Sequence, residues 1–225
     1  MGARGVKPKG KVKIKWSPEF AYAIGLIATD GCLSIDGYHI VLVSKDIEQL
    51  KTFKHCLGLD SKLAKHSSGH KKRDYFRVQF GDILFYQFLL GIGLTPAKSK
   101  TIGAVDVPQQ YFFDFLRGCF DGDGSFYSYW DPRWRSSFMY YLQLASASKS
   151  FIDWIRQSLR VRSEVIGHIT KDGKGSTYQL KYAKKESLKI IKKMYYSDTA
   201  VCLARKKEKI YKALKLDKSA RGCRN

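Results

Sequence analysis

One apolar helix pattern occurs twice in this chain, and the repeat limits the possible folds more than any other feature. The first copy begins at Ser17, which can cap a helix, with Pro18 at the first helical position, and it ends at Asp30-Gly31. The second copy follows Val107-Pro108 and ends at Asp121-Gly-Asp-Gly124, close to half of the chain later. A repeat at this period indicates two copies of one structural unit.

The segments that follow the two helices also match. Strand patterns are expected at 38–43 and 75–80 in the first copy and at 138–144 and 177–182 in the second, each preceded or followed by a pairing strand. Helices are expected at 47–57, 83–90, 151–159 and 186–195. Each copy therefore reads α-β-β-α-β-β-α, which predicts an α+β fold of two pseudo-symmetric units with helices on one face of antiparallel sheets.

The expected organisation is a basic N-terminal arm at 1–15, a first unit at 16–107 and a second unit at 108–225. A net charge of +21 with 44% hydrophobic residues indicates a folded basic protein rather than a disordered one. So much positive charge is typical of a protein that binds a polyanion, most often nucleic acid; an anionic membrane surface is the weaker alternative.

The cysteines and the apolar segments indicate the environment. Five cysteines without a C-x-x-C pair argue against a disulfide framework and favour a reducing compartment, such as an organelle or a prokaryotic cytoplasm. The N-terminus shows no secretory signal, and the longest apolar stretch, 83–94, is too short to span a bilayer. We therefore expect an intracellular protein with no membrane partner.

The two repeated helices carry the residues expected to perform chemistry. Gly25 and Gly118 occupy the same place in each copy, so the helices can approach closely and bring their C-terminal ends together. Helix C-termini present carbonyl oxygens and negative potential, and here each end also carries a carboxylate, Asp30 or Asp123. Two acids with nearby carbonyl oxygens predict a site for hard divalent cations, most plausibly Mg²⁺. The alternative is that both aspartates are only turn residues before glycine. The predicted metal-binding residues are Asp30, Asp123, Thr29 and Gly122.

The segments Ala23-Ile-Gly-Leu-Ile-Ala-Thr-Asp-Gly31 and Leu116-Arg-Gly-Cys-Phe-Asp-Gly-Asp-Gly124 resemble the motif that names the LAGLIDADG homing endonucleases of the single-chain, two-motif type. The resemblance implies saddle-shaped sheets that lie along the major groove of DNA and paired helices that place both aspartates over the minor groove. It also implies Mg²⁺-dependent double-strand cleavage, with Mn²⁺ able to substitute and Ca²⁺ supporting binding only. The first copy departs from the family in having Ala28 where an acid is frequent.

The resemblance further implies one catalytic lysine from each half, near the metal site. The candidates follow the third helix of each unit: Lys98 or Lys100 in the first half, and Lys206 or Lys207 in the second. For each of these lysines, ordinary phosphate contact remains an alternative.

Strand alternation predicts which side chains face DNA. A β-ribbon fits the major groove, where glutamine, arginine and lysine can pair with base edges. The predicted DNA contacts are Arg77, Gln79, Ser125, Tyr127, Tyr129, Arg133, Arg135, Tyr141, Gln143, Gln179 and Lys181. The strand at 38–43 is apolar on both faces, so its outward side cannot be assigned from the pattern.

The leading hypothesis is a monomeric, site-specific DNA endonuclease of an intron or intein. Because the outward residues of the two halves differ, we expect a long asymmetric target in double-stranded DNA. Two alternatives stay open: an RNA maturase that binds intron RNA and assists group I splicing, and an inactive DNA-binding regulator of the same fold. The presence of both aspartates favours cleavage.

Overall fold

The computed structural model describes residues 10–66, 75–134, 137–173 and 175–222. The first unit comprises α1 (Pro18–Thr29), β1 (Gly31–Leu33), β2 (His39–Ser44), α2 (Ile47–Leu57), β3 (Ala64–His66), β4 (Tyr75–Gly81) and α3 (Ile83–Gly91), followed by the 3-10 turn η1 (Lys98–Lys100). The second unit comprises the 3-10 turn η2 (Gln109–Tyr111), α4 (Phe112–Asp123), β5 (Gly124–Trp130), β6 (Phe138–Ser146), α5 (Lys149–Ser163), β7 (His168–Lys171), β8 (Tyr178–Tyr182), α6 (Lys184–Met194) and α7 (Ala204–Gly222). The predicted fold of two α-β-β-α-β-β-α units is confirmed.

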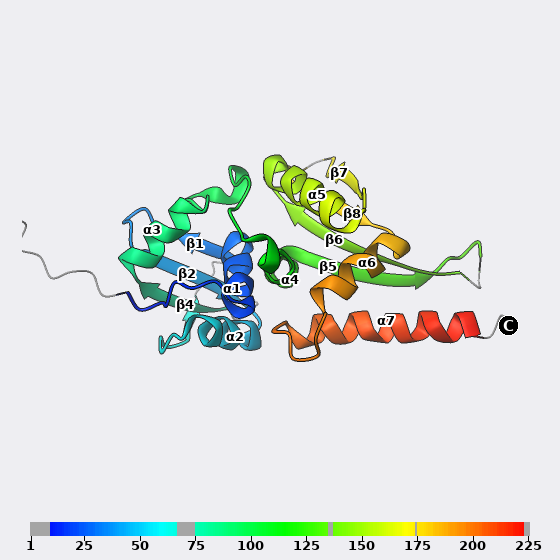
Figure 1. Cartoon of the computed structure of the whole chain (residues 1–225), viewed down its shortest axis with the longest axis horizontal. Coiled ribbons are helices and arrows are strands. Elements are labelled where there is room, and N and C mark those ends of the chain that lie inside the picture. Colours follow the sequence, from blue (N-terminus) through cyan, green and yellow to red (C-terminus); the bar gives the residue numbers. More distant parts are fainter. Residues whose placement is uncertain (1–9, 67–74, 135–136, 174, 223–225) are drawn as a thin grey trace, which may run out of the picture.

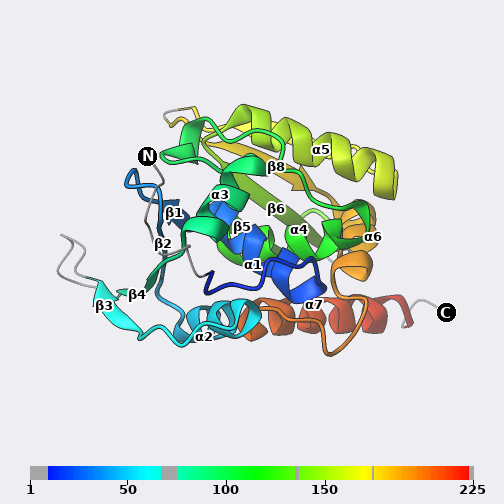
Figure 2. The ribbon, with the colours of Figure 1, turned by 60° about the vertical axis from the view of Figure 1, so that its left-hand side comes forward.

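Each unit contains one four-stranded antiparallel sheet. The strand orders, β1-β2-β4-β3 and β5-β6-β8-β7, are the same when the units are matched. Side chains alternate along the strands, so that Leu142, Leu144 and Leu180 are buried while the residues between them are more exposed. The buried face of each sheet packs against helices, and the other face is left open (Figures 1 and 2).

The two repeated helices, α1 and α4, lie side by side between the two sheets (Figure 1). Gly25 and Gly118 make the predicted close approach. A Cβ atom added at Gly25 would lie 2.1 Å from the carbonyl oxygen of Phe115, and one added at Gly118 would lie 2.1 Å from that of Tyr22. Only glycine permits this distance between the two backbones, and the helix ends are held together as a result.

The N-terminal segment differs from the expected free arm over part of its length. The backbone N–H groups of Lys11 and Val12 both donate to the Asp82 carboxylate, at 2.6 and 2.9 Å, and Val12 is buried. Asp82 also caps α3, so residues 10–12 are attached to the first unit. The rest of the predicted arm, residues 1–9, lies outside the described residues.

Two sequence assignments are corrected by the local structure. Helix α4 continues to Asp123, through the Asp121-Gly-Asp segment at which the apolar pattern stops, and a lysine side chain from α7 donates to carbonyl oxygens of its last turn. In the sequence, Ser44-Lys45-Asp46 and Ser148-Lys149-Ser150 introduce the two helices, which would match Ser44 with Ser148. The structure matches Ser44 with Ser146 instead, because Ser44 accepts a hydrogen bond from the N–H of Asp46 and Ser146 accepts one from that of Ser148. Asp46 and Ser148 are therefore the equivalent residues at the starts of α2 and α5.

Helix α7 has no counterpart of equal length in the first unit. It runs beside the second unit, and its first residues lie against α2 of the first unit (Figures 1 and 2). Of the helices in the described part of the chain, none combines the length and the apolar composition needed to cross a membrane.

Candidate functional site

The paired ends of α1 and α4 bring Asp30 and Asp123 into one site. A Cβ atom added at Gly122 would lie 2.1 Å from the hydroxyl oxygen of Thr29 and 3.1 Å from Oδ2 of Asp30, so the end of each helix touches the other. Asp30 is half-buried and Asp123 is exposed. The close approach of Gly25 and Gly118 one turn earlier is what sets this arrangement.

The pKa values of both carboxyl groups are raised, chiefly because burial removes part of their hydration. Loss of hydration raises the pKa of Asp30 to about 6, and the nearby Asp123 carboxylate contributes to the increase. The surrounding protein also raises the pKa of Asp123 by removing part of its hydration, while Lys206 and Lys98 act in the opposite direction. Lys206 and Lys98 thus limit the rise in the pKa of both aspartates, which favours the charged carboxylates near neutral pH.

Lys206 lies at the C-terminal end of α4. Its Nζ donates to the carbonyl oxygens of Phe120 (2.6 Å), Asp121 (2.9 Å), Gly122 (3.2 Å) and Gly124 (2.7 Å). Burial lowers its pKa to about 8, against the opposing influence of Asp121, Asp30 and Asp123. A cation at a helix C-terminus is electrostatically favoured, which explains why the side chain is held there.

Lys98 occupies the equivalent place in the first unit. It is buried, and its Nζ donates to the carbonyl oxygen of Gly31, directly after Asp30. Burial lowers the pKa of Lys98, and the charges of Asp123 and Asp30 counteract that decrease. One lysine from each unit thus lies within electrostatic range of both aspartates.

The alternative lysine in each predicted pair lies elsewhere. Lys100 is exposed on η1. Lys207 donates to the backbone carbonyl of Asp198 at 2.9 Å and makes no hydrogen bond to the end of α1 or α4 among the described residues. The structure therefore brings Lys98 and Lys206 to the aspartates and leaves Lys100 and Lys207 outside the site.

The donor set fits a hard divalent cation. Among the described residues, no hydrogen-bond donor and no cation lies within bonding distance of the Asp30 or Asp123 carboxylate, so their oxygens are available. No cluster of three or more histidine, cysteine or acidic side chains occurs in the described residues, so water, main-chain oxygens or a ligand must complete the coordination. The Gly122 carbonyl already accepts from Lys206, and the Thr29 hydroxyl donates within its own helix at 3.2 Å. The two carboxylates are the strongest ligands available.

A cavity of about 250 Å³ adjoins this site. Ala28, Thr29 and Asp123 line it on one side, Ser99 of η1 on another, and residues of β6 and the start of α5 complete it. It joins the helix ends to the open face of the second sheet, so one extended ligand can contact both.

The open face of the second sheet is polar and aromatic. Tyr127 and Tyr141 stack with ring centroids 5.1 Å apart, and Tyr129 stacks on Tyr141 at 6.2 Å. Cross-strand pairs continue the surface through Ser125 opposite Gln143, Gln143 opposite Lys181, and Ala145 opposite Gln179. Every predicted contact on these strands is at least partly exposed on this face: Ser125, Tyr127, Tyr129, Tyr141, Gln143, Gln179 and Lys181.

Over the described residues, the open face of the first sheet carries more apolar side chains along β2. Gln79 is exposed and lies opposite Val41, which in turn lies opposite Cys32; Arg77 lies opposite Val43. The pairing with β4 therefore assigns the outward side of β2, which alternation alone left open. The two sheets present different chemistry to a ligand.

The predicted arginines of the β5–β6 hairpin are placed only in part. The Arg133 side chain is exposed and pairs with Asp131 at 3.2 Å, in the turn and not on the sheet face. Arg135 lies outside the described residues.

Several residues of the site region were not predicted. His168 and Thr170 of β7 pair with Lys181 and Gln179 and extend the open face; the alternation of 168–171 carried this signal. Asp121 is buried, accepts hydrogen bonds from the Tyr22 hydroxyl (2.8 Å) and the Leu203 N–H (2.7 Å), and burial raises its pKa to about 6. No local pattern connects Asp121 to Leu203, so only the structure identifies this contact.

Comparisons with known proteins support the fold. A family model described as the LAGLIDADG-like domain matches residues 112–195. No curated protein matches the sequence. Together with the solved structures below, this match confirms the resemblance to LAGLIDADG proteins that the two motifs predicted.

Solved structures match nearly the whole chain at low identity. Full-length DUF199/WhiA from Thermatoga maritima matches with a TM-score of 0.57 and 16% identity, over 92% of this chain and 64% of that one, so this chain is shorter than that protein. The homing endonuclease I-DmoI in complex with DNA and Mn matches with a TM-score of 0.53 and 16% identity, over 80% of this chain and 97% of that one. The meganuclease I-SmaMI bound to uncleavable DNA matches with a TM-score of 0.57 and 14% identity, over 93% and 92%. At these identities the matches show the fold.

Proposed function

We propose that this chain is a site-specific DNA endonuclease that uses a divalent metal, preferably Mg²⁺, to cut both strands. One observation carries the proposal: Asp30 and Asp123 share one site without hydrogen-bond donors among the described residues, and Lys98 and Lys206 flank them. A fold alone does not fix a function, but this set of side chains is suited to phosphodiester hydrolysis.

The two aspartates would hold the cation, which when bound would activate water and offset the charge of the reacting phosphate. Lys98 and Lys206 place positive charge beside the same point and stabilise the additional negative charge of the transition state. Because the pKa of Lys206 is lowered to about 8, this side chain can also exchange a proton near neutral pH.

The two open sheet faces would bind successive segments of the major groove. The net charge of +21 supplies affinity for phosphates, and the glutamine, lysine and tyrosine side chains of the second sheet supply contacts to bases. Within the described residues the open faces of the two sheets carry different side chains, so a single chain would recognise an asymmetric target. We expect Mn²⁺ to replace Mg²⁺ in cleavage and Ca²⁺ to support binding only.

A DNA-binding regulator of the same fold is the second candidate, because the match to WhiA is as good as those to the endonucleases. The two candidates differ in what the helix ends must do. A regulator does not need paired carboxylates flanked by a buried Lys98 and a partly buried Lys206, so the presence of this site favours the endonuclease.

Selection of cleaved molecules from a random duplex library in Mg²⁺ tests the proposal. We expect recovery of one asymmetric sequence family that is cut by the native chain and not by Asp30→Asn. The matched control is Asp153→Asn, which removes an equally charged side chain from an exposed pair with Lys149 on α5 and should cut normally. Specific binding without any cleavage would instead assign the regulator function.

A further inference from the structure

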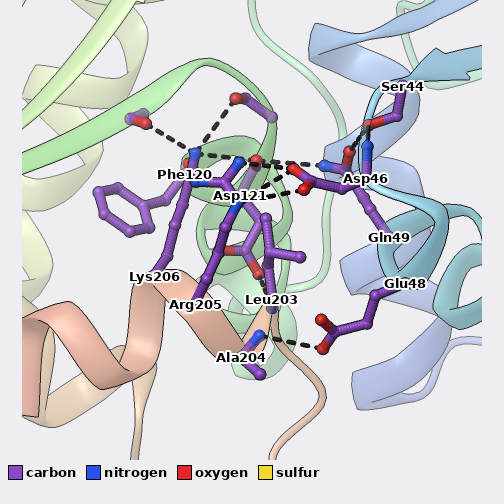
Figure 3. A network of polar contacts seen from close by, with 12 residues as sticks. Ser44, Asp46, Glu48, Gln49, Phe120, Asp121, Leu203, Ala204, Arg205 and Lys206 are labelled. Atoms are coloured by element: carbon purple, nitrogen blue, oxygen red, sulfur yellow. Dashed lines mark hydrogen bonds and ion pairs between the residues drawn. The ribbon is translucent and has the colours of Figure 1, made fainter. Parts of the chain in front are cut away.

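The start of α7, in the second unit, is held by acidic residues of the first unit. The Arg205 guanidinium forms an ion pair with Asp46, with its Nη2 atom 2.5 Å and its Nε atom 3.1 Å from Oδ2 of Asp46 (Figure 3). The backbone N–H of Ala204 donates to Oε1 of Glu48 at 3.2 Å. Asp46 and Glu48 belong to the start of α2 in the first unit, whereas α7 ends the second unit.

Asp46 contacts Arg205 and does not cap its own helix, α2. It stands at the N-cap position of α2, where an aspartate normally accepts a hydrogen bond from its own helix, yet it makes no such bond. Glu48 caps α7 from outside that helix. It accepts a hydrogen bond from the Ala204 N–H, one of the first N–H groups of α7, which have no partner within α7. The acids at the start of α2 therefore act on the other unit.

The ion pair between Asp46 and Arg205 lies next to the proposed active site, because the residue after Arg205 is Lys206. Lys206 follows Arg205 directly, and its Nζ donates to the carbonyl oxygens of Phe120 and Asp121 in the last turn of α4 (Figure 3). The charges of Asp30 and Asp123 act on this lysine. The chain leading into α7 is also fixed from the second unit: Asp121 accepts from the Leu203 N–H, and the buried Arg117 donates to the carbonyl of Val201 at 2.7 Å. The residues immediately before Lys206 are thus held by both units.

The first unit shows the equivalent contact in the opposite direction. Ser148 stands at the start of α5, in the place that corresponds to Asp46. Unlike Asp46 it also caps its own helix, accepting from the Phe151 N–H at 3.4 Å, while its hydroxyl donates to the carbonyl of Ile102 at 2.5 Å. Ile102 ends the turn that begins with Lys98, because its N–H donates to the Lys98 carbonyl at 2.8 Å. The start of α2 in the first unit therefore holds the segment with Lys206 in the second unit. The start of α5 in the second unit holds the segment with Lys98 in the first unit.

We propose that Asp46 is a positioning residue for Lys206, and that Ser148 has the same role for Lys98. This inference rests on the proposed nuclease function. The Asp46–Arg205 pair is largely exposed and contributes little to stability, so its main effect is to fix where α7 begins. Each lysine belongs to one half of the pseudo-twofold site, so loss of one contact should slow cleavage of one DNA strand more than the other.

The test compares Asp46→Asn, Ser148→Ala and the matched control Asp153→Asn on the selected duplex, in single-turnover and steady-state assays. Asp46→Asn should lower kcat about tenfold and leave KM within about twofold, because a small displacement of a reacting group costs rate more than binding. A nicked intermediate should accumulate, and Ser148→Ala should nick the opposite strand. The conservative Asp46→Glu and the charge exchange Asp46→Lys with Arg205→Glu should restore cleavage of both strands.

Hydrogen–deuterium exchange measures the contact without reference to activity. Asp46→Asn should speed exchange in residues 201–207 while Asp153→Asn does not. Unchanged exchange there, or unchanged kcat, would overturn the proposal, as would equal slowing of both strands that the charge exchange does not restore. If the native chain cut no duplex, the nuclease function would fail, whereas the exchange result would still decide whether Asp46 holds α7.

Discussion

The contact between Gly25 and Gly118 gives the sharpest test of how the two helices set the active site. In Gly25→Ala the new Cβ atom would lie 2.1 Å from the Phe115 carbonyl oxygen and 2.9 Å from the Cα atom of Gly118. Side-chain carbons essentially never approach other atoms closer than 3.0 Å, so the two backbones must separate by about 1 Å. Backbone atoms cannot rotate away as a flexible side chain can.

The expected cost follows from two opposing effects. Overpacking in a tight contact destabilises by about 3 kcal/mol, while alanine is favoured over glycine inside a helix by about 1 kcal/mol. The net loss of about 2 kcal/mol should lower Tm by about 4 to 8 °C in a protein of this size. Cleavage should fall by about 100-fold, because a displacement of about 1 Å separates the groups that act on the phosphate.

Gly91→Ala is the matched control. Gly91 ends α3, and a Cβ atom added there meets nothing within 4 Å. This variant should be as stable as the native chain or slightly more stable, and it should cut normally. Thermal unfolding by circular dichroism and single-turnover cleavage measure both variants. A Gly25→Ala protein with native Tm and native cleavage would show that α1 and α4 do not depend on this close approach.

Three further predictions concern the charges of the site. Asp30→Asn or Asp123→Asn should each abolish double-strand cleavage, because each variant removes a metal ligand. DNA binding should stay intact or become tighter, because each variant also removes a negative charge near the phosphates. Cleavage and gel-shift assays measure the two effects, and near-normal cutting would mean that the site is misplaced. The pH–rate profile should be bell-shaped: below pH 6 a proton occupies Asp30, whose pKa is raised to about 6, and above pH 8 Lys206, whose pKa is lowered to about 8, loses its charge. A rate that stays constant from pH 5 to about 9 would contradict these roles. Binding of the selected duplex in Ca²⁺ should weaken steeply with salt, with a slope of about −0.9 per neutralised phosphate in a plot of log K against log salt, and a flat response would exclude the electrostatic model of binding.

Local sequence patterns determined the elements of this protein and the identity of its acids. Apolar runs with capping residues predicted α1 and α4, and alternation predicted that Gln143 and Lys181 lie on the open sheet face, as they do. Such features follow from the fixed periods of helices and strands, which relate residues only a few positions apart. The repeat extended this local information by showing that two copies of one unit must meet at their glycine-bearing helices.

Packing between distant segments decided the rest. Lys98 and Lys100 lie on the same 3-10 turn, which follows Ala97 in a left-handed conformation with φ of 52°, and no periodicity indicates which of them turns inward. The outward side of β2 became defined only through its register with β4, and the contact of Lys206 of α7 with the end of α4 likewise joins segments far apart in the chain. The Asp46–Arg205 pair joins residues from opposite units. Contacts of this kind depend on how whole elements fit together in three dimensions, and a linear pattern of residues does not encode that geometry locally.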